Sequence, residues 1–248
     1  MTALSVNLNK IALIRNSREG NYPNIVKHAQ LCIDHGAEGI TVHPRPDQRH
    51  IRPDDVRQLA ALLVGNIDVE FNIEGNPFAP ALADYPGFIP LVEETQPNQC
   101  TLVPDSDDQL TSDHGFDLTS CGEALAPIVQ RLKSQGMRVS LFMDPDLEQI
   151  KLASQLGADR IELYTGPYAA AWGSDGIHDI FQSHLAAAEL ATELGMGVNA
   201  GHDLNLDNLG QFASIPNLLE VSIGHAFTVD SLAMGMGNAV LAYKALLA

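Results

Sequence analysis

The chain has 248 residues, of which 45% are hydrophobic, and carries a formal net charge of −17 at pH 7. This length fits one large α/β domain, and the hydrophobic share suffices for a full core. The negative charge argues against nucleic acid or an anionic membrane as a partner of the general surface, because either would be repelled.

Strand-like runs rich in β-branched and apolar residues recur along the whole chain. The predicted strands cover residues 4–7, 40–42, 69–73, 100–103, 139–142, 160–164, 197–200 and 220–223. Helix-like segments lie between most of them, at residues 23–35, 53–63, 120–135, 147–156, 177–194 and 207–213. Several helical segments end in glycine, as helix C-termini often do, at Gly36, Gly136, Gly157 and Gly195.

Eight strands alternating with helices predict a parallel (β/α)8 TIM barrel that forms a single domain over residues 1–248. A doubly wound open sheet is the alternative, but no Gly-rich dinucleotide turn follows the first strand. Residues 75–90 are rich in Pro and Gly and predict a long loop before a short helix. Residues 166–179 are a candidate mobile lid, because Gly173 and Gly176 would let that segment move.

One stretch, GITVHPRPDQRHI at residues 39–51, carries an unusual set of polar side chains. Its β-branched run ends at a pair of prolines, and proline cannot continue a central strand. His43, Arg45, Arg49 and His50 therefore follow the C-terminal end of a buried strand, where chemistry sits in parallel α/β proteins. In a chain with only 14 Lys and Arg, this basic cluster indicates an anionic ligand such as a phosphate.

Polar residues also follow the other predicted strands, so we expect an active site at this rim of the barrel. They include Asn7, Asn9, Lys10, Arg15, Arg18, Asn72, Glu74, Thr111, Glu162, Tyr164, Thr165, Asn199, His202, Asp203, Ser222, Gly224 and His225.

The histidines and carboxylates at the rim suggest acid–base chemistry. His43, His202 and His225 can converge on one pocket, and histidine titrates near neutrality. Partial burial would raise the pKa of Glu74 and make it a general base, although pairing with a cationic side chain is the alternative. Glu162 is predicted to face the barrel interior, where it needs either a cationic residue or a cationic intermediate as its partner.

Two anion sites are expected at the rim. Backbone N–H groups at residues 201–202 and 224–225 can hold one phosphate, as the last strands of such barrels often do. Arg18, Arg45 and His50 can hold another. Two anion sites imply two phosphorylated substrates or one bisphosphate.

Three other interpretations stay open. His43, Glu74, His202 and His225 could bind a divalent metal, although the surplus of arginine suits phosphate better. An aldolase would need a Schiff-base lysine, for which Lys10 is the candidate. A phosphate-binding barrel without catalysis would need no convergent His and Glu.

The chain resembles the pyridoxine 5'-phosphate synthase family of vitamin B6 biosynthesis over essentially its whole length. The motifs that carry the resemblance are VNLNKIALIRNSR, GITVHPRPDQRHI, FNIEGNP, TLVPD, RIELYTG, VNAGHDLNLDNL and VSIGHA, in this order. The resemblance implies a (β/α)8 barrel that needs neither metal nor redox cofactor and assembles into a homo-octamer. It also implies a condensation of 3-amino-2-oxopropyl phosphate with 1-deoxy-D-xylulose 5-phosphate, which yields pyridoxine 5'-phosphate, inorganic phosphate and water.

The resemblance further implies a role for each matching residue. His43 and Glu74 would accept protons, His202 would donate one, and Glu162 would stabilise a charged intermediate or transition state. The phosphate of the amino ketone would be held by Asn7, Arg18, Gly224 and His225. The phosphate of the sugar would be held by Arg45, His50 and Thr111.

Three places along the chain depart from the commoner family pattern. Asn9-Lys10 replaces a usual Asp-His pair, and Lys10 can still meet an anion. Glu19 stands where Gly is usual, and Asp203 follows His202 where many members have Gly. We interpret these as variation within the family.

The cysteines and the N-terminus bear on compartment. Cys32, Cys100 and Cys121 are widely spaced and odd in number, which indicates neither a metal site nor a disulfide framework. The N-terminus lacks a signal-peptide apolar region, and no apolar run approaches the roughly 20 residues needed to span a bilayer. We therefore expect a cytoplasmic protein.

Overall fold

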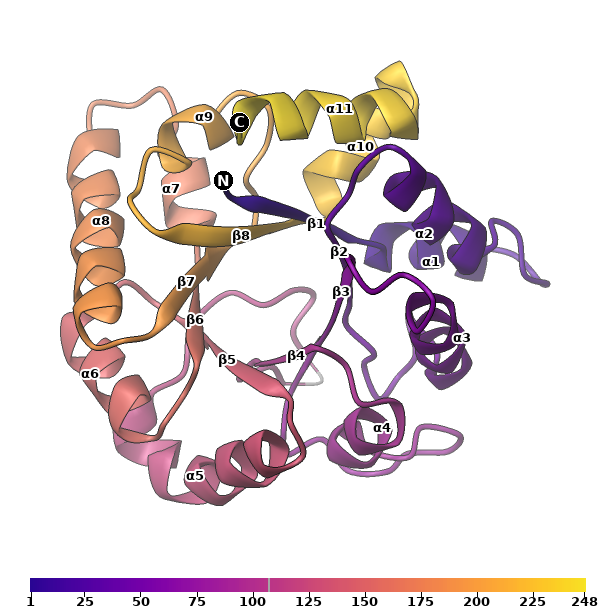
Figure 1. The fold of residues 1–248 in the computed structure, drawn as a ribbon, viewed down its shortest axis with the longest axis horizontal. Helices are drawn as coiled ribbons and strands as arrows, with labels where there is room; N and C mark the ends of the chain where they lie inside the picture. The colour runs from indigo at the N-terminus through magenta and orange to yellow at the C-terminus, as the bar shows by residue number, and fades with distance from the viewer. Residues whose placement is uncertain (107) are drawn as a thin grey trace.

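The computed structural model describes residues 1–106 and 108–248. Strands β1 to β8 pair in parallel in chain order, and β8 pairs back to β1, which closes the barrel. The strands are β1 Ala3–Asn7, β2 Gly39–Val42, β3 Glu70–Gly75, β4 Gln99–Leu102, β5 Arg138–Met143, β6 Arg160–Leu163, β7 Gly197–Ala200 and β8 Leu218–Ile223. Figure 1 shows the strands as a ring with helices around it, so the predicted parallel (β/α)8 barrel is confirmed.

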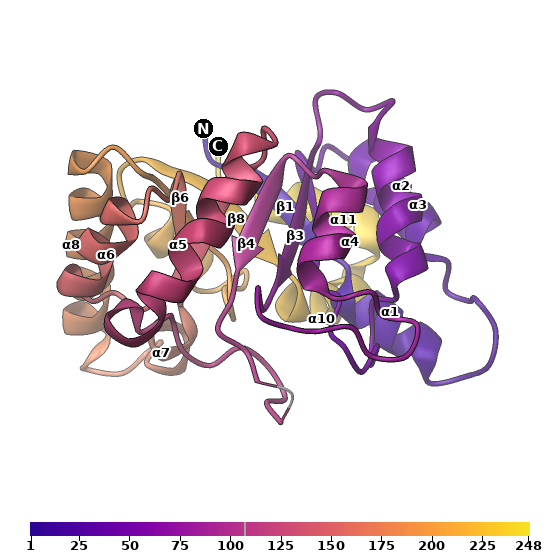
Figure 2. The same ribbon diagram turned by 90° about the horizontal axis from the view of Figure 1, so that it is seen from below.

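The helices surround the barrel, and Figure 2 shows α1, α7 and α10 gathered toward one end of it. The helices are α1 Asn9–Asn16, α2 Ile25–Asp34, α3 Pro53–Leu63, α4 Phe88–Thr95, α5 Leu118–Ser134, α6 Leu147–Gln155, α7 Gly166–Ala170, α8 Ile177–Glu193, α9 Leu209–Phe212, α10 His225–Met234 and α11 Met236–Leu246. None of the helices in the described parts of the chain combines the length and apolar character needed to cross a membrane.

Each predicted strand and helix is present, with boundaries that differ by a few residues. The four glycines predicted to end helices all adopt positive φ angles, between 82° and 98°. Helices α1, α7, α10 and α11 were not predicted. The start of α1 was interpreted as a polar strand end, and the region of α10 and α11 is interrupted by Gly235, which separates the two helices.

Segment 166–179 contains a firmly packed part. Its first half is α7, in which Tyr168 is fully buried and its hydroxyl donates a hydrogen bond of 3.0 Å to the carbonyl of Asn208. Residues 172–176, which contain both glycines, follow this helix and are largely exposed. Closure of this segment as a lid stays a prediction.

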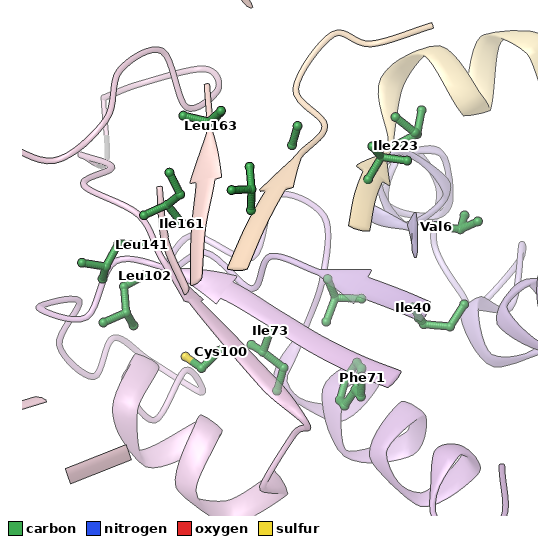
Figure 3. Close-up of a cluster of buried hydrophobic side chains, with 14 of the residues drawn as sticks. Val6, Ile40, Phe71, Ile73, Cys100, Leu102, Leu141, Ile161, Leu163 and Ile223 are labelled. Atoms are coloured by element: carbon green, nitrogen blue, oxygen red, sulfur yellow. The ribbon is translucent and has the colours of Figure 1, made fainter. Parts of the chain in front are cut away.

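The main hydrophobic core lies between the strands and the helices. Alternate strand residues such as Val6, Ile40 and Ile161 point outward into it (Figure 3). The opposite residues face the barrel interior, which is polar: the Ser5 and Thr41 hydroxyls lie 2.7 Å apart, and Thr101 donates to Asn72 over 3.0 Å. Polar side chains on alternate strand residues thus fill the inside of the barrel, and the last of them lie at its C-terminal rim.

Candidate active site

A pocket of about 400 Å³ opens at the C-terminal ends of the strands. Nearly all the predicted site residues line it: Asn7, Asn9, Lys10, His43, Arg45, His50, Glu74, Thr111, Glu162, His202, Asp203, Gly224 and His225. They come from both halves of the chain, because the barrel brings the ends of β1, β2, β3, β6, β7 and β8 to one rim.

Two asparagines hold the first three strand ends together. Asn7 Nδ2 donates to Glu74 Oε2 over 3.3 Å, and Asn7 Oδ1 accepts from the backbone N–H of Asn9 over 3.0 Å. Asn9 Oδ1 in turn accepts from the backbone N–H of His43 over 2.8 Å. An asparagine oxygen serves this contact as well as an aspartate oxygen would, so Asn9 fits its position.

Three of the basic residues that follow β2, His43, Arg45 and His50, are buried. His50 Nδ1 accepts a hydrogen bond of 2.9 Å from the backbone N–H of Ile51, so a neutral His50 carries its proton on Nε2. Burial lowers the pKa of His50 to about 3, and the charges of His43, Arg45 and Lys10 act in the same direction. At neutral pH His50 is therefore a neutral donor beside the permanently charged Arg45 guanidinium, which suits recognition of an anion.

Two carboxyl groups face the same pocket from β3 and β6. Burial raises the pKa of Glu74 well above its usual range, and the nearby charges of Glu162, Glu220 and Asp105 raise it further. Burial also raises the pKa of Glu162 to about 8, with Glu220 adding to the shift. Glu162 can therefore exchange a proton near neutrality, and Glu74 holds its proton more firmly than an exposed glutamate would.

Glu162 has no cationic protein partner within residues 1–106 and 108–248. Arg160, the arginine on the same strand as Glu162, binds Glu220 instead, with 3.0 Å between Nη1 and Oε2. The sequence analysis expected Glu162 to pair with either a cationic residue or a cationic intermediate. The described residues do not provide the first of these partners.

His202 follows β7 and lines the same pocket as His43, which follows β2. Its Nε2 is 2.9 Å from the hydroxyl of Thr111, and its Nδ1 is 3.1 Å from Asp203 Oδ2. The contact with His202 is the main cause that holds the pKa of Asp203 below its usual value. Asp203 adopts a φ of 64°, in the left-handed region that favours glycine, which explains why glycine suits this position.

Glycines allow the close backbone approach expected after β7 and β8. A Cβ on Gly201 would come within 2.1 Å of the carbonyl oxygen of Ser222, so no other residue fits there. A Cβ on Gly224 would lie 3.1 Å from Cβ of Asn7. Gly224 directly precedes α10, whose first residue is His225, and both residues line the pocket, so the N-terminus of this helix lies at its wall.

Two predicted arginines lie elsewhere. Arg15 is completely buried and pairs with Asp55 while donating to the carbonyl of His50 over 2.9 Å, so it supports the loop that carries His50. Arg18 is exposed, lies beyond the end of α1, and is not among the residues that line the pocket.

The sequence interpretation missed several lining residues: Leu13, Val103, Leu110, Ser112 and Phe142. It also missed Asp105, which is 7% exposed and contacts both His43 and Arg45. Asp105 is the last residue of the TLVPD motif and closely follows a predicted strand, so its place in the sequence could have indicated a site residue.

Within the described ranges 1–106 and 108–248, no three His, Cys, Asp or Glu side chains are grouped closely enough to hold a metal ion. His43 and Glu74 face each other, with 3.8 Å between Nδ1 and Oε2.

Known proteins resemble this chain in sequence and in fold. A family model described as "Pyridoxal phosphate biosynthesis protein PdxJ" matches residues 4–248. The chain is 55% identical over 243 residues to the pyridoxine 5'-phosphate synthase of Xanthomonas axonopodis pv. citri (strain 306), covering 98% of this chain and 95% of that protein. It is 51% identical over 243 residues to the protein of the same name from Xylella fastidiosa (strain M23), covering 98% and 93%.

Solved structures with the same fold are much more distant in sequence. The tryptophan synthase alpha chain from Legionella pneumophila subsp. pneumophila has a TM-score of 0.65 and 12% identity, covering 99% of this chain and 91% of that one. Phosphoribosyl anthranilate isomerase from Thermotoga maritima has a TM-score of 0.60 and 11% identity, covering 100% and 98%. At such identities the likeness concerns the barrel fold alone.

Proposed function

Because the chain belongs to the family of the pyridoxal phosphate biosynthesis protein PdxJ, we propose that it is a pyridoxine 5'-phosphate synthase. In this proposal it condenses 3-amino-2-oxopropyl phosphate with 1-deoxy-D-xylulose 5-phosphate and releases inorganic phosphate and water. The reaction is of the transferase class. The observation that carries the proposal is the buried, unpaired carboxyl of Glu162 in a pocket with basic groups at its rim.

The position of Glu162 suits a cationic intermediate. A carboxyl with a pKa of about 8 is mostly protonated in the empty pocket at neutral pH. An iminium formed from the substrate amine and the ketone of the sugar would favour the carboxylate, because an opposite charge nearby lowers the pKa of a buried acid. Glu162 would thus stabilise charge only when the charge has formed, which is what transition-state stabilisation requires.

Proton transfer is assigned to three residues around the same pocket. Glu74 or His43 would remove a proton from the imine to give an enamine. Phosphate would then leave, a water would add and later depart, and His202 would donate protons as the ring closes. The 3.8 Å between His43 Nδ1 and Glu74 Oε2 supports this assignment, because both groups can reach one substrate carbon.

The two phosphates would bind on either side of the end of β1, one after β8 and the other after β2. Gly224 and His225, at the N-terminus of α10, would hold the phosphate of the amino ketone beside Asn7. Arg45 and His50 would hold the phosphate of the sugar.

Thr111, Lys10, Asn9 and Asp203 line the same pocket and would complete the two phosphate sites. The role of Arg18 in binding the amino ketone stays a prediction, since this residue lies outside the lining. A homo-octameric assembly is likewise proposed from the family resemblance, and a cytoplasmic location from the sequence itself.

The test mixes purified protein with 1-deoxy-D-xylulose 5-phosphate and freshly generated 3-amino-2-oxopropyl phosphate in the presence of EDTA. Pyridoxine 5'-phosphate is followed by its fluorescence and confirmed by mass. Formation of product at an enzymatic rate is the expected result. Absence of product while both substrates bind would refute the proposed reaction, and trapping of a Lys10 adduct with borohydride would favour an aldolase.

A further inference from the structure

Asp105 occupies a buried position behind the pocket, just after β4. Its backbone carbonyl accepts a hydrogen bond of 2.7 Å from Asn76 Nδ2, which holds the turn in place. Its side chain is directed toward the two residues that follow β2. Arg45 Nη2 donates to Asp105 Oδ2 over 2.5 Å, and His43 Nε2 lies 3.2 Å from the same oxygen.

This shared oxygen determines which ring nitrogen of His43 carries the proton. Because Arg45 donates to Oδ2, that oxygen acts as an acceptor. A lone pair on His43 Nε2 would face a second lone pair at 3.2 Å and be repelled, whereas an N–H there is attracted. The proton of a neutral His43 therefore belongs on Nε2.

The other ring nitrogen then faces the chemistry. Burial, with the charges of Arg45 and Arg49, lowers the pKa of His43 well below its usual value, so the ring is neutral. Its Nδ1 points toward Glu74, with 3.8 Å between Nδ1 and Oε2. With the proton on Nε2, Nδ1 presents a lone pair to the pocket.

We propose that Asp105 is a positioning residue: it fixes His43 in the tautomer that presents Nδ1 as a proton acceptor and at the same time orients the Arg45 guanidinium. One carboxylate oxygen thereby couples the orientation of a base to that of an anion-binding arginine. The catalytic consequence rests on the proposed function, whereas the tautomer itself is a property of the protein without substrate.

The direct test is 15N NMR of the imidazole nitrogens at neutral pH, with the His43 signals assigned by their loss in His43→Gln. Wild-type protein is expected to show a protonated Nε2 and an unprotonated Nδ1. Asp105→Ala removes the acceptor and is expected to give a mixture of tautomers. Asp105→Asn keeps a carbonyl oxygen that can accept from both neighbours, so it is expected to restore the single tautomer.

A matched control is Asp55→Ala. Asp55 is likewise a buried aspartate paired with an arginine, Arg15. This arginine contacts a histidine only through the backbone carbonyl of His50. Its loss removes the same kind of ion pair and is expected to leave the His43 nitrogen signals unchanged.

Kinetics complete the test. We expect Asp105→Ala to lower kcat about ten- to a hundredfold, the range for residues that orient a reacting group, and Asp105→Asn to recover most of it. A wild-type His43 protonated on Nδ1 overturns the proposal, even if neither variant folds. An unchanged tautomer in folded Asp105→Ala, or an unchanged kcat despite a mixed tautomer, also overturns it. Tautomer control by Asp105 in a protein that makes no product would uphold the positioning and refute the proposed function instead.

Discussion

Replacing Glu74 by glutamine separates the chemistry of this site from its shape. Glutamine has nearly the same volume, and its carbonyl oxygen can accept the hydrogen bond that Asn7 Nδ2 donates over 3.3 Å. The carboxylate that would accept a proton is lost. We expect kcat to fall by about two to four orders of magnitude, which corresponds to about 3–5 kcal/mol of transition-state stabilisation. KM should change less than about threefold, because substrate binding would rest on other residues.

The same substitution should leave the protein as stable or make it more stable. Glu74 is buried near Glu162, Glu220 and Asp105, and removing one acid from this group ends its repulsion with the others. The assay combines steady-state kinetics, with fluorescence detection of product, and urea denaturation of both proteins at pH 8. A folded Glu74→Gln protein with kcat within about threefold of wild type would refute Glu74 as the base.

Three further predictions follow from the structure. Because the pKa of Glu162 rises from 4.5 to about 8 on folding, the folded chain retains a proton that the unfolded chain has released, so the free energy of unfolding should fall by a few kcal/mol as the pH rises from about 4.5 to about 8. Urea titrations should show that the free energy of unfolding of Glu162→Gln depends less steeply on pH than that of the wild type. Parallel curves of this free energy against pH for the two proteins would contradict the prediction. Lys10→Met should raise KM for one phosphorylated substrate about three- to tenfold and reduce its salt dependence, measured by initial rates at two ionic strengths. Arg15→Met should lower the free energy of unfolding by about 3–5 kcal/mol, because Asp55 is left buried and unpaired; a loss below about 1 kcal/mol in urea would contradict this.

The barrel was predictable because its strands carry a simple pattern. Residues such as Val6, Ile40 and Ile161 alternate with polar ones, and glycines mark the ends of helices. Helices α10 and α11 could not be predicted in the same way. Their exposed Val229, Leu232 and other apolar side chains blur the amphipathic pattern that would mark a surface helix.

The pocket was predictable from strand ends alone, but partners across the barrel were not. Asp105 lies 60 residues from Arg45 in the sequence, and only the registers of β2 with β3 and β3 with β4 bring them together. Arg15 and Arg18 look equivalent in sequence, since both follow the first strand. The turn of α1 directs Arg15 inward to Asp55 and leaves Arg18 beyond the helix end.

The pairing of β1 with β8 has a consequence for the newly made chain. Ala3 pairs with Glu220 and Val6 with Ile223. The first strand to be synthesised therefore cannot form one of its two pairings until the last strand has been made. Until β8 has left the ribosome, β1 and β7 are open edges that can pair with other chains. The pocket also draws on both ends of the chain, so no partial product of translation holds a complete site. Recovery of activity during refolding would therefore report closure of the ring itself.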